Sequence, residues 1–230
     1  MQYFRSALFA LIFYPATLIY VLAGIAGSLF GVRPMRAVVH AWADLHHVLT
    51  THLLGVHAKR IGSIPQGKVI VAVKHQSMYE TIEMLRLANT PAVILKKELA
   101  DIPLFGWLTR RYGVIPVDRG AGAKALRDML KHARAASDAG RPIVIFPEGT
   151  RVPPGQTPPL QAGFSGIYRL IGLPVVTIAV DSGLIWGRGL LKKPGTVRFL
   201  IGDVIPAGLP RDEIEARVHA GINALETSAP

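Results

Sequence analysis

The chain of 230 residues contains no cysteine, which excludes disulfide bonds, thiolate nucleophiles and cysteine-ligated zinc sites. Acidic residues are also scarce: 15 Asp and Glu stand against 26 Lys and Arg, so the formal net charge is +11. A surplus of this size implies an anionic partner, which can be nucleic acid, acidic lipid headgroups or a phosphorylated substrate. The length suits one sizeable core with an appendage, and the sequence contains no internal repeat.

The basic residues do not follow a nucleic-acid-binding pattern. They occur as scattered pairs, such as Arg110 with Arg111 and Lys192 with Lys193, and no recognition helix or RNA-binding signature accompanies them. We therefore do not expect a nucleic-acid partner. Anionic membrane lipid explains the charge better, because each suitably placed cation contributes ~1 kcal/mol of attraction to an acidic membrane surface.

Charged residues are missing altogether from one long N-terminal run. From Ala7 to Val32, 26 consecutive residues are uncharged, and as a helix they would measure ~39 Å against a hydrocarbon core of ~30 Å. Pro15 and three glycines interrupt the run, so a spanning helix and a broken, re-entrant or interfacial hairpin both fit. A cleaved signal peptide fits poorly, because its apolar core has only ~7 to 15 residues and a convincing cleavage site is missing here.

A second helix is expected directly after this run. Apolar positions recur at helical spacing from Pro34 to Leu54, which predicts an amphipathic helix that ends at Gly55. We therefore expect residues 1–55 to form a membrane anchor with an amphipathic helix, and residues 56–230 to form an α/β domain. The histidines of the second helix lack the spacing of a metal site, so no metal is expected.

From Val69 onward, short β-branched runs alternate with helical stretches, which predicts a mostly parallel sheet flanked by helices. The predicted strands are Val69–Val73, Ala92–Leu95, Val114–Val117, Ile143–Phe146, Val175–Val180 and Val197–Ile201. The predicted helices are Ser77–Ala88, Leu104–Tyr112, Ala123–Ala139, Phe164–Ile171 and Pro210–Thr227.

The first motif with chemical potential is Lys-His-Gln-Ser-Met-Tyr-Glu, which joins the first of these strands to a helix. Ligand sites form at the carboxyl ends of strands in such sheets. His75 can act there as a general base, and Glu80 can fix its tautomer if His75 precedes the helix and folds back over the first turn. The competing interpretation is structural, because Ser77 and Glu80 also make a capping box.

Two further motifs follow strands in the same way. The hexapeptide Phe-Pro-Glu-Gly-Thr-Arg, residues 146–151, combines a glycine turn with exposed amides, a hydroxyl and a guanidinium, groups that can grip a phosphate. Lys96 and Arg119 each follow an apolar strand and can reach the same edge of the sheet as His75. In isolation, each of these features is also compatible with an ordinary turn or a solvated rim.

Together the motifs resemble the 1-acylglycerol-3-phosphate acyltransferase family of glycerolipid acyltransferases. The resemblance covers about half of the chain and includes four blocks in the family's order. The blocks fall on His75 with Glu80; on Lys96, Leu99, Gly106 and Arg119; on Phe146 through Arg151; and on Leu173 through Val176. Two positions depart from the pattern: Glu80 stands where Asp is commoner, and Thr177 replaces a second proline often seen in the last block.

The resemblance implies an acyltransferase that moves a fatty acyl group to the sn-2 hydroxyl of 1-acylglycerol-3-phosphate, giving phosphatidic acid, and it implies roles for individual residues. His75 would deprotonate the acceptor hydroxyl, and Glu80 would orient His75. The acceptor phosphate would be held by Lys96, Arg119, Glu148, Gly149, Thr150 and Arg151. No cofactor is implied, since acyl-CoA or acyl-carrier protein serves as the donor substrate, and the expected place is the cytoplasmic face of the inner membrane.

Two alternatives to this reaction stay open from the sequence. The enzyme can act on another lysolipid, such as a lyso-aminolipid, or run the reverse hydrolytic reaction. A non-catalytic phospholipid-binding membrane protein would need the basic residues but not His75 with Glu80.

Overall fold

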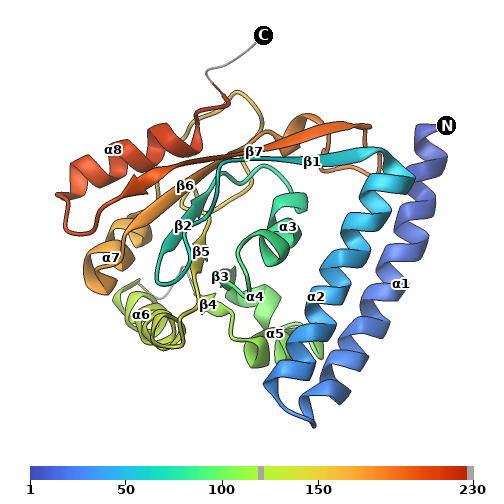
Figure 1. The fold of residues 1–230 in the computed structure, drawn as a ribbon, viewed down its shortest axis with the longest axis horizontal. Helices are drawn as coiled ribbons and strands as arrows, with labels where there is room; N and C mark the ends of the chain where they lie inside the picture. The colour runs from blue at the N-terminus through green and yellow to red at the C-terminus, as the bar shows by residue number, and fades with distance from the viewer. Residues whose placement is uncertain (119–121, 227–230) are drawn as a thin grey trace.

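The computed structural model describes residues 1–118 and 122–226. Within them a seven-stranded sheet runs through the centre of the molecule in the order β1-β7-β6-β2-β5-β3-β4 (Figure 1). All neighbouring strands are parallel except β6 and β7. The strands are β1 Val56–Ile61, β2 Ile70–Val73, β3 Ala92–Lys96, β4 Ile115–Val117, β5 Ile143–Ile145, β6 Val175–Val180 and β7 Gly195–Ile205.

This sheet confirms the predicted fold class, and each of the six predicted strands has a counterpart in it. One strand, β1, was not predicted because only Val56 of its side chains is buried and it carries Lys59 and Arg60. As an edge strand it pairs, among the described residues, only with β7. Its sequence therefore lacks the apolar run that marks a central strand.

Helices cover both faces of the sheet. They are α1 Gln2–Ser28, α2 Val32–Val48, α3 Tyr79–Leu87, α4 Lys97–Ala100, α5 Phe105–Tyr112, α6 Gly122–Asp138, α7 Ala162–Ile171 and α8 Arg211–Ile222. Helices α6, α7 and α8 lie on one side of the sheet, and α1, α2, α3 and α5 lie on the other (Figure 1).

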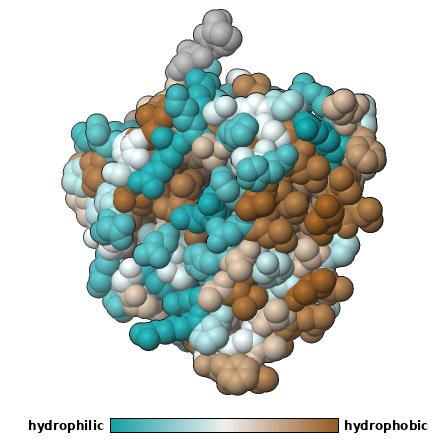
Figure 2. Space-filling model, turned by 45° about the vertical axis from the view of Figure 1, so that its right-hand side comes forward, coloured by the Kyte–Doolittle hydropathy of each residue, from teal (hydrophilic) through white to brown (hydrophobic). Residues whose placement is uncertain are grey.

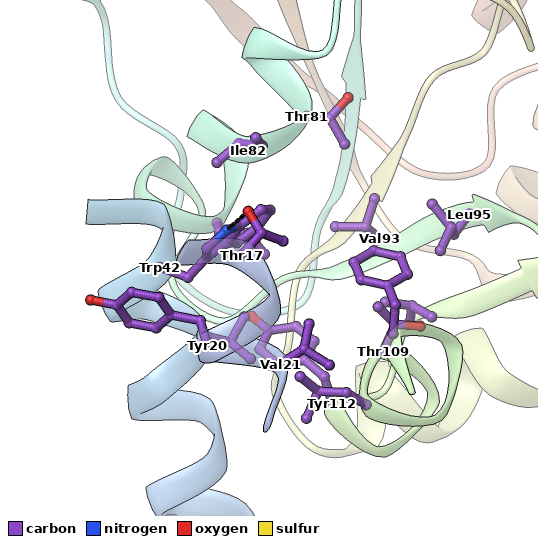
Figure 3. A pocket seen from close by; sticks show the side chains of 15 residues that line it. Thr17, Tyr20, Val21, Trp42, Thr81, Ile82, Val93, Leu95, Thr109 and Tyr112 are labelled. Atoms are coloured by element: carbon purple, nitrogen blue, oxygen red, sulfur yellow. Dashed lines mark hydrogen bonds between the residues drawn. The ribbon is translucent and has the colours of Figure 1, made fainter. Parts of the chain in front are cut away.

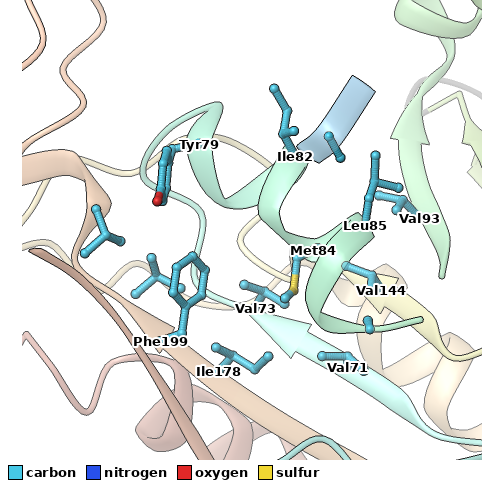
Figure 4. Close-up of a cluster of buried hydrophobic side chains, with 14 of the residues drawn as sticks. Val71, Val73, Tyr79, Ile82, Met84, Leu85, Val93, Val144, Ile178 and Phe199 are labelled. Atoms are coloured by element: carbon cyan, nitrogen blue, oxygen red, sulfur yellow. The ribbon is translucent and has the colours of Figure 1, made fainter. Parts of the chain in front are cut away.

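The alternation of side chains along β2 explains the two cores. Val71 and Val73 point to the face covered by α3, where Met84 packs on them (Figure 4). Ile70 and Ala72 point to the opposite face and join the core under α6, α7 and α8. All four residues of β2 are fully buried, and the strand lies at the centre of the sheet. The residues that follow β2 are therefore held in a fixed position.

The N-terminal apolar run forms an unbroken helix that passes through Pro15 and turns back into α2. The two helices pack along each other, and Phe9 and Phe13 are buried on their inner side. The 27-residue helix α1 has a mean hydropathy of 2.1 over its most apolar window, of which only 22% is buried. Apolar side chains accordingly gather on this side of the surface (Figure 2).

The second N-terminal helix is also present, although its last part departs from α-helical geometry. Helix α2 continues into a π-helical turn, Leu49–Leu54, and Gly55 ends it with a left-handed φ of 70°. On its inner side His46 and His47 face the buried Glu83 of α3, with Nδ1 to Oε1 distances of 3.6 and 3.4 Å. The hairpin is thus attached to the helix that follows His75.

Gly106 on α5 has a specific steric reason to be glycine, because a Cβ there would overlap the carbonyl group of Ala100. We expect Gly106→Ala to lower the free energy of unfolding by about 1–3 kcal/mol, the usual cost of overpacking. Gly163→Ala on α7 is the matched control: nothing lies within 4 Å of its added Cβ, so it should gain up to ~1 kcal/mol of helix propensity. Denaturant unfolding measures both, and equal stability of the two variants would contradict the overlap.

Candidate active site

Three buried strands bring the site together at one edge of the sheet. Strands β5 and β6 both pair in parallel with β2, so their carboxyl ends point the same way. His75 follows β2, residues 146–151 follow β5, and Ser182 follows β6. The backbone joins the first two, since Val152 N–H donates to the carbonyl of His75 at 2.7 Å.

His75 and Glu80 form a direct side-chain pair. Nδ1 of His75 lies 2.9 Å from Oε1 of Glu80. Because a carboxylate only accepts hydrogen bonds, Nδ1 carries a proton, and in the neutral imidazole Nε2 then has the lone pair. None of the described residues hydrogen-bonds Nε2, and the histidine side chain is 17% exposed whereas Glu80 is fully buried. The imidazole is therefore held as a base whose reactive nitrogen is open to a substrate.

Glu80 is held in place by four further donors. Its Oε1 accepts the backbone N–H groups of Gln76 and Ser77 at 2.7 and 2.6 Å. Its Oε2 accepts the hydroxyls of Ser77 and Ser182, each at 2.6 Å. Burial works to raise the pKa of Glu80, but the hydrogen bond and charge of His75, followed by these hydroxyls, outweigh it and lower the pKa. Glu80 is therefore charged at neutral pH.

The capping interpretation of Glu80 accounts for part of this geometry. Helix α3 begins at Tyr79, so Met78 rather than Ser77 is the N-cap residue. Glu80 still accepts the N–H of Ser77, as the carboxylate of a capping box does, while Ser77 Oγ accepts the N–H of Tyr79 at 3.1 Å. One carboxylate thus serves the start of the helix and His75 together, so the two interpretations do not exclude each other.

Glu148 makes a different contact from the one that the motif suggests. Its carboxylate is fully buried, with Oε1 2.6 Å from Nζ of the equally buried Lys74 and Oε2 accepting the backbone N–H of His75 at 3.2 Å. The ammonium group of Lys74 also donates hydrogen bonds to the carbonyl of Gln156 and to Oδ1 of Asn223. This arrangement, which we call the Lys74 clamp, positions the His75 loop and leaves Glu148 no oxygen facing a substrate.

The end of the hexapeptide, Thr150 and Arg151, faces outward. Gly149 adopts a left-handed φ of 73° and its N–H donates to the carbonyl of Phe146 at 2.9 Å, which makes the turn. Thr150 and Arg151 are exposed beyond it. The ring of Phe146 lies against the imidazole of His75, with 4.3 Å between centroids. The turn therefore presents a hydroxyl and a guanidinium next to the His75–Glu80 pair.

Lys96 lies farther along the same edge, at the end of β3, and is separated from β2 by β5. Its side chain is exposed and its Nζ lies 3.0 Å from Oε1 of Glu98. The structure therefore does not bring Lys96 into contact with His75. Arg119 lies outside the residues that the structure describes.

Comparison with known proteins agrees with this geometry. A protein-family model described as Acyltransferase matches residues 55–181, more than half of the chain. The chain belongs to this acyltransferase family. A 1-acyl-sn-glycerol-3-phosphate acyltransferase from Pseudomonas aeruginosa is 32% identical over 183 residues, which cover 76% of this chain and 71% of the relative.

Two further acyltransferases support the assignment. The 1-acyl-sn-glycerol-3-phosphate acyltransferase of Helicobacter pylori is 39% identical over 101 residues, covering 43% of this chain and 42% of the relative. The crystal structure of the 1-acyl-sn-glycerophosphate (LPA) acyltransferase PlsC from Thermotoga maritima aligns over the whole of both chains with a TM-score of 0.76. At 23% identity this second likeness concerns the fold.

Three polar residues of this acyltransferase site were not assigned from the sequence. Ser182 could have been suspected, because it directly follows the buried strand β6 at the same edge as His75. Lys74 stands inside the first motif, yet a lysine there is ordinarily expected to be solvent-exposed. Asn223 lies just beyond the chain's last helix, and no local pattern connects it to Lys74.

An apolar pocket lies beside the site on the side of α1 and α2. It encloses about 760 Å³ of empty space, part of it open to solvent. Figure 3 shows its walls, with Thr17 and Trp42 from the N-terminal hairpin, Thr81 from α3, Val93 from β3 and Thr109 from α5. Thr81 directly follows Glu80 on α3, so one wall of the pocket belongs to the helix that carries the partner of His75.

Proposed function

We propose that this acyltransferase moves a fatty acyl group from acyl-CoA or acyl-carrier protein to the sn-2 hydroxyl of 1-acyl-sn-glycerol 3-phosphate, giving phosphatidic acid. The observation that carries the proposal is the His75–Glu80 pair, in which Nε2 of His75 has no hydrogen-bond partner among the described residues and the exposed Arg151 follows the neighbouring strand. The Pseudomonas aeruginosa relative, whose name states this acceptor, supports the choice of substrate.

The reaction follows from the tautomer of His75. Its Nε2 takes the proton of the acceptor hydroxyl as the oxygen attacks the thioester carbonyl. The carbon–sulfur bond then breaks, and the imidazolium returns the proton to the departing thiolate, so no covalent acyl-enzyme is required. Glu80, held charged and buried, orients the ring and stabilises the imidazolium that forms between the two transfers.

The acceptor's phosphate is assigned to the turn after β5. Arg151 supplies a charge-assisted contact and Thr150 a hydroxyl, while Gly149 makes the turn that presents them to the phosphate. Lys96 and Arg119 stay proposals as further contacts of the phosphate. The role we propose for Glu148 is to hold the His75 loop through the Lys74 clamp, because both of its oxygens are occupied.

The apolar pocket is the place we propose for the acyl chain. Thr81→Phe would fill space at the wall that α3 contributes, and each methylene displaced from an apolar wall costs ~0.8 kcal/mol, or about fourfold in binding. We expect kcat/KM to fall progressively with donor chain length while the shortest donors are spared. A series of acyl-CoA donors measures this, and an unchanged chain-length profile would remove the pocket from the proposal.

We propose that the enzyme is bound to the cytoplasmic face of the inner membrane, where the acyl thioester arrives from the cytoplasm. Helix α1 supports this, since Leu11, Leu18 and Ile19 expose more than half of their surface. Binding to anionic vesicles should weaken but persist in 1 M salt, because screening to ~3 Å removes the attraction of the basic surface and not the burial of α1. Vesicle flotation measures the bound fraction, and complete release by salt would contradict insertion.

The function itself is tested with purified protein in mixed micelles. Labelled acyl-CoA or acyl-carrier protein is supplied with a panel of lysophospholipids and lyso-aminolipids, and the products are separated by thin-layer chromatography. We expect label in phosphatidic acid with the wild type and none above background with His75→Ala. Preferred labelling of a lyso-aminolipid would replace the acceptor, and labelling that survives His75→Ala would refute the mechanism.

A further inference from the structure

A second pocket lies on the other side of the His75 loop and has a different lining. It encloses about 670 Å³ of empty space, part of it open to solvent. Its walls are the N-terminal part of α1, the residues 76–78 that directly follow His75, and the loop between β6 and β7. Neither Lys96 nor any described residue of the predicted phosphate site other than Arg151 lines it.

Three cations line this pocket. Arg151 comes from the turn after β5, and Arg188 and Lys192 come from the loop before β7. Of the described residues that form the lining, none is Asp or Glu. The guanidinium of Arg188 donates to the backbone carbonyl of Arg151 at 3.0 Å, so the two loops are tied together at this point. Positive charges gathered around a hollow without a carboxylate favour an anionic ligand.

Lys192 is held at the pocket by several contacts. Its Nζ lies 4.9 Å from the centroid of the buried Trp186 ring and donates to the carbonyls of Gly187 and Gly189. Two of the three ammonium protons are used in this way, which leaves one for a ligand. Burial, and next the nearby charge of Arg151, lower the pKa of Lys192. A bound anion would offset both effects.

The pocket is also built against the helix that we place in the membrane. The Oγ of Ser6 on α1 accepts the backbone N–H of Lys192 at 3.0 Å, and Phe9 packs edge-on against Trp186. The three cations therefore border both α1, beside which a membrane lipid would lie, and the residues that follow His75. An anionic headgroup is the part of such a lipid that this lining can hold.

We infer that this pocket is the subsite for the phosphate monoester of the acceptor lipid, in which Arg188 and Lys192 act together with Arg151. The inference rests on the proposed function. In the acceptor, the carbon that carries the phosphate is directly bonded to the carbon that carries the reacting hydroxyl. In acyl-CoA, the phosphates lie at the far end of the pantetheine arm from the thioester. A pocket walled by the residues next to His75 therefore suits the acceptor.

The test compares Arg188→Gln with Lys193→Gln, which removes the same charge from a neighbouring residue outside the pocket. Each protein receives acyl-CoA with either 1-acylglycerol 3-phosphate or 1-acylglycerol, which lacks the phosphate. We expect Arg188→Gln to raise KM for the phosphorylated acceptor about ten- to a hundredfold, the usual effect of losing a hydrogen bond between charged groups. The KM for acyl-CoA should change less than about twofold, and Lys193→Gln should behave as the wild type.

Each other result has a definite meaning. If Arg188→Gln raises KM for acyl-CoA instead, the pocket holds the donor's phosphates and the inference is overturned. It is also overturned if both acceptors are affected equally, or if Lys193→Gln matches Arg188→Gln. Binding of 1-acylglycerol 3-phosphate without donor, measured by calorimetry in micelles, separates the two proposals: a wild type that binds it about tenfold better than Arg188→Gln but transfers no acyl group would contradict the proposed function and keep the subsite.

Discussion

Glu80→Gln is expected to lower kcat by about 10²-fold or more while the protein stays folded. The amide is uncharged, so it no longer stabilises the imidazolium of His75, and its NH₂ group can select the wrong tautomer of the ring. In serine proteases the equivalent Asp→Asn change lowers kcat by ~10⁴, which sets the upper scale. Steady-state kinetics with saturating acceptor and donor measure the change.

The neighbouring turn of α3 provides the control. Glu83 is also fully buried and pairs with histidines, but its partners His46 and His47 lie on α2. Glu83→Gln removes a similar charge from the same helix without touching His75, so its kcat should stay within a few-fold of the wild type. If the two variants lose the same activity, a general disturbance of α3 explains Glu80 and the catalytic pairing is wrong.

Stability against pH separates the charge of Glu80 from its hydrogen bonds. Its pKa is lowered in the folded protein, so the charged form adds stability above the ordinary pKa of glutamate, and this stability is lost as the pH falls through the folded-state value. The Gln variant lacks this contribution. Its free energy of unfolding should therefore fall less than that of the wild type between pH 7 and the acid range.

Lys74→Met should have the largest effect on stability, a loss of about 3–5 kcal/mol in the free energy of unfolding. The change leaves the carboxylate of Glu148 buried without its counter-charge, and it also removes the donor to Gln156 and Asn223. Lys68→Met is the matched control, since Lys68 forms an exposed ion pair with Asp138 at 3.9 Å, and exposed pairs contribute less than ~1 kcal/mol. Urea unfolding in detergent compares the variants.

A double variant tests the cause. Adding Glu148→Gln to Lys74→Met removes the unpaired charge and should restore part of the lost stability, although Glu148→Gln alone destabilises the protein. Additive losses in the double variant would show that the residues act separately. In that case the Lys74 clamp would not be an ion-pair unit.

Local sequence patterns were sufficient to predict most of the sheet and the residues that surround His75. Buried strands such as β2 and β6 appear as continuous β-branched runs, and parallel strands place the residues after them at one edge. The contact of His75 with Glu80 followed from that rule, because the pair meets only when the histidine precedes the helix. Whether these residues catalyse the reaction stays a prediction until the variants are measured.

Features that depend on residues far apart in the chain could not be predicted from local sequence patterns. Neither an apolar run nor Pro15 tells whether α1 crosses a membrane alone or packs beside α2, because the choice depends on packing with the domain. The side chain of Lys74 is expected to be exposed until Glu148 and Asn223 surround it. The position of Ser182 after a buried strand was a usable signal, but its contact with Glu80 was not, because that contact depends on how β6 lies beside β2.

Because the chain leaves the ribosome from its N-terminus, the strand order of the sheet determines when the protein can finish folding during synthesis. Strand β1 ends at Ile61, but its only neighbour is β7, which begins at Gly195, and Lys74 needs Asn223 near the C-terminus. A nascent chain that has released His75 and the hexapeptide therefore still lacks its sheet edge and part of the support of the His75 loop. Such late, long-range contacts slow folding and favour exposed intermediates. The hydrophobic hairpin emerges before the sheet, so membrane attachment would precede the appearance of activity during synthesis.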